Sequence, residues 1–147
     1  MDRPPLAPSF GCSQDGPAQE GNNPLKTRAF APFDYAETPV EPGRTLVEAS
    51  AGTGKTFALA GLVLRLVLDG DDLRGADGLP DLRRLLVVTF TVAATEELKT
   101  RIRGALRTAL RVARGEAEPD DLTRPLAPLL ARDDAEGRLL AALDRVD

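Results

Sequence analysis

Histidine is absent from the 147 residues, and Cys12 is the only cysteine. Disulfide frameworks, Cys/His zinc sites, histidine general bases and Ser-His-Asp triads are therefore excluded within this sequence. Any chemistry has to come from carboxylates, hydroxyls, lysine, arginine and the backbone.

Long apolar runs are also missing. The longest, Phe57–Leu68, is interrupted by Arg65 and is shorter than the roughly 20 residues that cross a bilayer. The N-terminal stretch MDRPPLAPSFG has no apolar core of a signal peptide. We therefore expect a cytoplasmic protein with no membrane partner.

Proline is concentrated at one end of the chain. Eight of the twelve prolines fall in the first 42 residues, among Gly, Asn and Ser, without helical or strand periodicity. Such a composition cannot bury enough apolar surface to offset the entropy of ordering. Residues 1–32 are therefore predicted to form a disordered Pro/Gly-rich arm.

The remaining chain carries alternating strand and helix signals. Residues 45–49 and the continuous apolar run 85–90 predict strands, the second of them typical of an interior parallel strand. Residues 55–68, apolar nearly all round, predict a helix that is buried on several sides, and residues 92–114 predict a second helix. Strand, helix and strand together form a βαβ unit, so the expected fold class is α/β.

A glycine-rich loop joins the first predicted strand to the first predicted helix. Its residues are Ala49, Ser50, Ala51, Gly52, Thr53, Gly54, Lys55 and Thr56. The order matches the phosphate-binding pattern G-x-x-x-x-G-K-[ST], except that Ala49 stands at the first glycine. Gly52 and Gly54 allow successive backbone N–H groups to point at an anion. Lys55 supplies a cation for the β- and γ-phosphates and Thr56 a hydroxyl ligand for Mg²⁺, so both are catalytic candidates.

The loop has three alternative interpretations. The loop could be a plain glycine turn with an exposed Lys55. The full G-x-G-K-T pattern between a predicted strand and a predicted helix is a more specific signal and favours a phosphate-binding loop. A GTPase is unsupported, because none of Lys26, Lys55 and Lys99 belongs to an N/T-K-x-D motif. A small-molecule kinase stays open, although further strands and a substrate lid would be expected.

Two long strings carry a family resemblance. TLVEASAGTGKTFALAGLVLRLVL (residues 45–68) and LLVVTFTVAATEELKTRIR (residues 85–103) resemble the N-terminal part of superfamily 1 DNA helicases of the UvrD/Rep type, most closely the beta subunits of exodeoxyribonuclease V. The phosphate loop of that family commonly reads A-S-A-G-T-G-K-T, which accounts for Ala49. The resemblance extends from about Phe33 to about Arg103.

The resemblance implies a fold, ligands and partners. The fold would be an incomplete three-layer P-loop NTPase (RecA-like) fold, with residues 33–114 as the start of the ATP-binding domain and 115–147 as its acidic loop and helical segment. The phosphate loop would bind ATP and Mg²⁺. Thr89, Phe90 and Thr91 would contact single-stranded DNA, with a base stacked on the aromatic ring. Duplex-end DNA and other subunits of a helicase-nuclease complex are further expected partners, and an accompanying exonuclease activity stays open.

The second predicted helix carries a basic ridge. Residues 85–114 hold six basic and two acidic side chains, whereas residues 115–147 hold four basic and nine acidic ones. The ridge consists of Lys99, Arg103, Arg107 and Arg111, spaced by four residues and therefore side by side on a helix. Arg103 is a further DNA-contact candidate. The alternative is the solvated face of an amphipathic helix.

The acidic second motif of the family is missing before Asp147. The segment 139–144 has an apolar-then-Asp shape, but its alanines and the following Arg145 favour a helix instead. We therefore expect an N-terminal segment of an ATP-dependent DNA helicase that binds nucleotide but does not hydrolyse it alone. A non-catalytic truncated fragment is the alternative.

Overall fold

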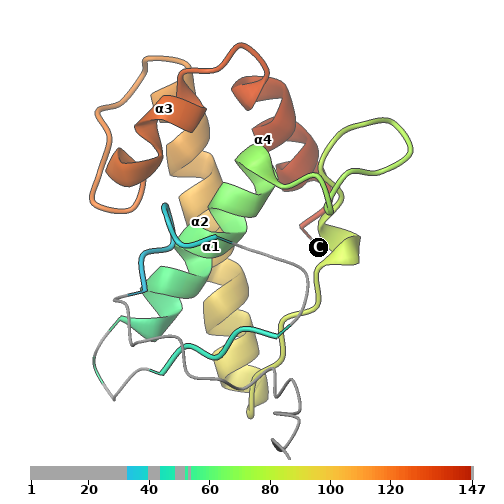
Figure 1. Cartoon of the computed structure of the whole chain (residues 1–147), viewed down its shortest axis with the longest axis vertical. Coiled ribbons are helices and arrows are strands. Elements are labelled where there is room, and N and C mark those ends of the chain that lie inside the picture. Colours follow the sequence, from blue (N-terminus) through green and yellow to red (C-terminus); the bar gives the residue numbers. More distant parts are fainter. Residues whose placement is uncertain (1–32, 40–43, 49–51, 53, 147) are drawn as a thin grey trace, which may run out of the picture. The chain divides into compact units, whose positions relative to one another are not determined.

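The computed structural model describes residues 33–39, 44–48, 52 and 54–146. In these parts of the chain the helical elements are, in order, α1 (Lys55–Asp69), η1 (Leu82–Arg84), α2 (Val92–Ala113), η2 (Arg124–Leu126), α3 (Ala127–Leu130) and α4 (Ala135–Asp144) (Figure 1). The two long predicted helices are confirmed as α1 and α2, and the helical prediction for 139–144 is confirmed by α4. The predicted arm, residues 1–32, lies outside the described residues.

The predicted strands do not form in the part of the chain that the structure describes. Its only β-bridge is an isolated antiparallel one between Arg74 and Pro80. Residues 44–48 and 85–89 run as unpaired chain, so the sheet of the expected α/β fold is not confirmed. The physical reason is that an interior parallel strand needs neighbours on both edges, and an isolated pair of strands is marginal in water.

Segment 85–90 nevertheless keeps the side-chain alternation of a strand. Leu86, Val88 and Phe90 are 85%, 79% and 107% exposed, whereas Leu85 and Val87 are half-buried against the core. Successive side chains of an extended backbone point to opposite sides. One side of this segment therefore packs on the helices, and the other presents apolar groups to solvent.

The core lies between helices. Helix α1 packs against α2, α3 and α4, and α2 also packs against α4. Figure 1 shows α1 crossing α2, with α3 and α4 near the C-terminal ends of both long helices. The largest fully buried apolar side chains include Leu64, Leu68, Leu106, Leu126 and Leu139. In the described residues the buried side of α1 is thus covered by three helices and not by a sheet, while Phe57 and Leu59 near its start stay 42% and 41% exposed.

A buried arginine of α4 closes the C-terminal end of α1. That end contains no basic residue in its last turn, and its last carbonyls lack helical partners. Arg138, 2% exposed, donates from Nε to the Val67 carbonyl at 2.8 Å and from Nη2 to the Gly70 carbonyl at 3.5 Å. Next to it, the exposed Arg132 pairs with Asp69 at 2.8 Å. The positive guanidinium groups also complement the negative end of the helix dipole.

The lead-in segment 33–39 is held against the first half of α1. The Tyr35 hydroxyl donates to the Leu122 carbonyl at 2.9 Å, and its ring meets that of Phe57 edge-on, with centroids 5.9 Å apart. Burial, followed by nearby carboxylates, raises the pKa of Tyr35 above its ordinary value. Gly61 leaves the space for this ring, because a Cβ there would lie 2.5 Å from a Tyr35 ring carbon. The lead-in is therefore ordered by side-chain packing and not by secondary structure.

The loop between α1 and η1 is tied down by ion pairs. Asp81 accepts hydrogen bonds from Nε of Arg83 at 2.9 Å and from Nη2 at 2.8 Å, and this pairing lowers the pKa of Asp81 to about 2. Asp77 pairs with Arg145 at the end of α4, and that hydrogen bond lowers the pKa of Asp77.

Among the described helices, none is both long and apolar enough to span a membrane.

Candidate functional site

The N-terminus of α1 is the first part of the site. Gly54 is its N-cap residue, with φ 84°, and Gly52 has φ 78°. Both angles lie in the left-handed region, which L-residues with a Cβ rarely adopt. Among the described residues no side chain caps the helix, and no acidic residue stands in its first turn. This helix start, at the positive end of the helix dipole, is therefore suited to an anion.

The two chemically active candidates of the loop open this helix. Lys55 is the first residue of α1 and is exposed, whereas Thr56 is half-buried. The other predicted loop residues, Ala49, Ser50, Ala51 and Thr53, lie outside the described residues. The arrangement suits a nucleoside triphosphate with its Mg²⁺, because it combines glycines in the left-handed region, a helix start, a lysine and a hydroxyl. Within the described residues no group of three His, Cys, Asp or Glu side chains lies close enough together to hold a metal ion.

The second part of the site is the junction that precedes α2. The Thr91 side chain caps the helix by accepting a hydrogen bond from the Ala94 N–H at 3.1 Å. The hydroxyls of Thr89 and Thr95 lie 2.7 Å apart, and each is 3.1 Å from the Thr91 carbonyl oxygen. This network fixes the backbone on both sides of Phe90. Thr95 was missed by sequence reasoning, although its four-residue spacing from Thr91 predicts such a contact.

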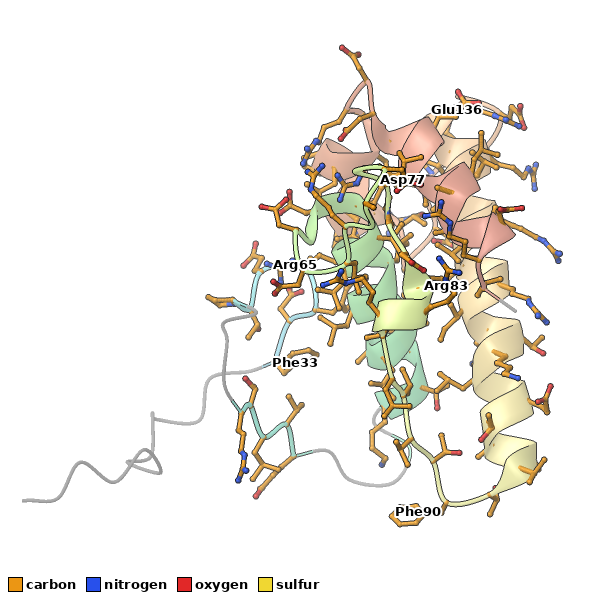
Figure 2. All side chains as sticks on the ribbon, turned by 90° about the vertical axis from the view of Figure 1, so that its right-hand side faces the viewer. Phe33, Arg65, Asp77, Arg83, Phe90 and Glu136 are labelled. Carbon is orange, nitrogen blue, oxygen red and sulfur yellow. The ribbon has the colours of Figure 1, made fainter. Side chains whose placement is uncertain are left out.

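Phe90 projects away from the helices. Figure 2 shows its ring beyond the start of α2, pointing outward from the turn. Its side chain is fully exposed at 107%, which is unusual for a large aromatic group in a folded protein. An aromatic ring presented on a turn with a braced backbone offers a flat face on which a nucleic-acid base can stack.

The two parts of the site lie at the same end of the helices. Figures 1 and 2 both show α1 and α2 starting at this end, so the described start of α1 at Gly54 and Lys55 lies at the same end of the helices as the junction before α2. Arg103 is not grouped with them. It follows Thr91 by twelve residues on α2, which corresponds to about 18 Å along the helix axis.

The basic ridge is a mixed surface. Lys99 pairs with Glu96 at 3.4 Å. Arg103 is half-buried, whereas Arg107 and Arg111 are exposed. Only the last two arginines of the ridge are therefore directed mainly toward solvent.

Comparison with known families identifies the domain. Residues 34–128 match the family model of the UvrD/REP helicase N-terminal domain. The chain belongs to this helicase family. The phosphate loop and the Thr89–Thr91 junction both lie within the matched residues, and the family places the chain among P-loop NTPases even though the described residues form no strands.

Individual relatives agree with the family. The chain is 53% identical over 89 residues to the RecBCD enzyme subunit RecB of Escherichia coli K12, with 54% of this chain aligned. It is 44% identical over 81 residues (55% of this chain) to the subunit of the same name from Mycobacterium tuberculosis CDC 1551, and 46% identical over 79 residues (53%) to that of Chlamydia trachomatis. The match covers 7% of each of these relatives. No solved structure matches the chain.

Proposed function

We propose that this chain is the N-terminal ATP-binding segment of an ATP-dependent DNA helicase that acts in a recombinational-repair helicase-nuclease of the cytoplasm. It binds Mg²⁺-ATP through residues 49–56 and single-stranded DNA through Thr89, Phe90 and Thr91. The observation that carries this proposal is the uncapped start of α1, where Gly54 has φ 84° and Lys55 and Thr56 follow directly. Membership of the UvrD/REP helicase family supports it.

Each residue of the loop has a distinct task in nucleotide binding. The backbone N–H groups around Gly52 and Gly54 donate to phosphate oxygens. Lys55 neutralises charge between the β- and γ-phosphates, and Thr56 ligates Mg²⁺ through its hydroxyl. Bound Mg²⁺ supplies further charge neutralisation on the phosphates. Together these contacts select a polyphosphate over a single phosphate, because only the longer anion reaches the loop amides and the lysine at once.

The DNA contact rests on the junction before α2. Phe90 offers a stacking face, and the hydroxyl network of Thr89 and Thr95 restrains the turn that presents it. Stacking on an aromatic side chain tolerates any base, as a translocating enzyme requires. We propose that single-stranded DNA, or a strand freed at a duplex end, is bound here, and that other subunits of a helicase-nuclease complex are the protein partners.

Calorimetry of Mg²⁺-ATP and Mg²⁺-ADP binding tests the nucleotide site. Lys55→Ala is expected to weaken binding by about 1.5–3 kcal/mol, because a charge-assisted contact to phosphate is lost. Lys99→Ala is the matched control, since it removes an exposed lysine of α2 that pairs with Glu96. Equal affinity for the parent and the Lys55 variant would remove the phosphate-loop assignment.

Fluorescence anisotropy with a labelled oligothymidine tests the DNA contact. Phe90→Ala is expected to weaken binding by about 1–3 kcal/mol, the scale of one lost base stack, and to leave its salt dependence nearly unchanged. Leu86→Ala is the matched control, because Leu86 is a large exposed apolar residue of the same segment without an aromatic ring. If both variants lose affinity equally, general hydrophobic contact and not stacking explains the binding.

A further inference from the structure

A groove separates the middle of α2 from the end of α4. Its volume is about 440 Å³, and it is lined by Thr100, Arg103, Arg107, Leu143 and Val146. One wall carries a hydroxyl and two guanidinium groups, whereas the other is aliphatic. Ligand pockets in proteins typically measure about 300–1,000 Å³, so the groove has room for one small ligand with an anionic and an apolar part.

The polar wall is suited to a phosphate. Arg103 and Arg107 are one helical turn apart and therefore project from the same face of α2. Among the described residues Arg107 forms no ion pair, and its side chain is exposed. Guanidinium forks donate paired hydrogen bonds to phosphate oxygens, and the Thr100 hydroxyl is a further donor beside them.

The apolar wall is suited to a base or a sugar. Leu143 and Val146 are half-buried and pack against the core, so they form a fixed surface. A phosphate alone would leave this wall in contact with water. A nucleotide unit instead covers it with an apolar ring face while its phosphate meets the arginines, and this fit identifies the ligand class.

The position of the groove relates it to the DNA junction. Arg103 lies about 18 Å along α2 from Thr91, which equals about five nucleotides at the 3.4 Å per-strand spacing of duplex DNA and fewer nucleotides of a more extended single strand. We infer that the groove holds a nucleotide unit of the same single-stranded DNA that stacks on Phe90, with its phosphate on Arg103 and Arg107. This inference rests on the proposed function and extends its DNA path along α2.

The test is the salt dependence of oligothymidine binding by the full 147-residue chain. A labelled 12-mer, long enough to reach both contacts, is titrated between about 50 and about 200 mM NaCl. Arg107→Ala is expected to flatten the log–log slope by about 0.7, so that the affinity lost over this range shrinks about 2.6-fold relative to the parent. Arg101→Ala is the matched control: it removes the same charge from α2 at an exposed residue that pairs with Glu97 and does not line the groove.

A second pair of variants addresses the α4 wall. Val146→Asp places a carboxylate in the groove and should weaken binding of the 12-mer several-fold more than Leu140→Asp, which adds the same charge at an exposed residue of α4 outside the groove. Competition with thymidine monophosphate and with inorganic phosphate separates the possible sources of the ligand. Full displacement of the DNA by either small molecule at millimolar concentration would assign the groove to a free phosphate compound and overturn the inference.

The outcomes separate this inference from the proposed function. The groove inference is refuted if Arg107→Ala keeps the salt-dependence slope of the parent, or if the Arg107 and Arg101 variants change that slope equally. The proposed function would survive this result as long as Phe90→Ala still weakens DNA binding. If neither Phe90→Ala nor Arg107→Ala changes binding, the DNA contact of the proposed function falls with it. Circular dichroism of each variant tests whether the helical content of the parent is retained.

Discussion

Replacing Arg138 with methionine should cost more stability than any change at an exposed arginine of the C-terminal helices. The substitution keeps most of the side-chain volume but removes the donor to the Val67 carbonyl, which it meets at 2.8 Å in a buried position. Loss of a hydrogen bond from a charged donor costs about 1.5–3 kcal/mol. The 3.5 Å contact to Gly70 is at the limit of a hydrogen bond and adds little.

Two terms partly offset each other in this estimate. Methionine avoids the desolvation of a buried guanidinium, whereas the exposed carboxylate of Asp134, 3.6 Å from Arg138, loses a partner of small value. We therefore expect a net loss of about 1.5–3 kcal/mol. With a urea slope of about 1.5 kcal/mol per M, the unfolding midpoint falls by about 1–2 M.

Urea unfolding followed by circular dichroism measures this loss. Tyr35 is the only tyrosine in a chain without tryptophan, so its fluorescence reports on the lead-in segment. Coincident fluorescence and circular dichroism transitions would indicate that the lead-in and the helices unfold together. Arg132→Met is the matched control, because Arg132 also contacts the end of α1, through Asp69, but is exposed. Arg132→Met should lower the free energy of unfolding by less than about 1 kcal/mol. Equal midpoints for the two variants would refute the argument that burial makes the Arg138 contact valuable.

Three further changes test the packing of the lead-in, the glycine in α2 and the ion pair of the loop before η1. Gly61→Ala should destabilise the chain by about 1–3 kcal/mol, because the new Cβ would lie 2.5 Å from the Tyr35 ring. Gly104→Ala, with open space at its Cβ, should instead stabilise α2 by about 0.5–1 kcal/mol, and thermal unfolding distinguishes the two. Asp81 has a pKa of about 2, below its ordinary 3.8, so its pairing with Arg83 stabilises the fold above pH 3.8 and is lost as the pH falls toward 2. Asp81→Asn should lower the urea midpoint at neutral pH, and its difference from the parent should shrink as the pH falls from 3.8 through about 2 and disappear only below that. A constant difference would contradict the ion-pair explanation.

The helices could be predicted from the sequence because their signals are local. The bounds of α1 follow from glycines at both of its ends, and the start of α2 follows from the capping side chain of Thr91. The strands could not be decided in this way. Segment 85–90 has the composition and alternation of a strand, but a strand exists only when another backbone pairs with it, and no composition rule supplies that partner.

The candidate site divides along the same line. The glycine-rich loop and the Thr89–Thr91 junction are contiguous motifs, so their residues could be named from spacing alone. Thr95, the Tyr35 ring beside Phe57, and the groove between α2 and α4 arise from tertiary packing. Their individual residues are ordinary in the sequence, and only the fold brings them together.

The unpaired segment 85–90 has a consequence for how the polypeptide behaves in concentrated solution. Within the described residues its backbone from Leu86 to Phe90 forms no ladder with any other segment, and its solvent side is wholly apolar. Such an edge is a template for cross-β stacking between identical molecules. The charges that flank it, Arg83 and Arg84 on one side and Glu96 and Glu97 on the other, act as gatekeepers against this process. A lysine at Val88 would extend that protection into the segment itself and keep the protein monomeric at higher concentration.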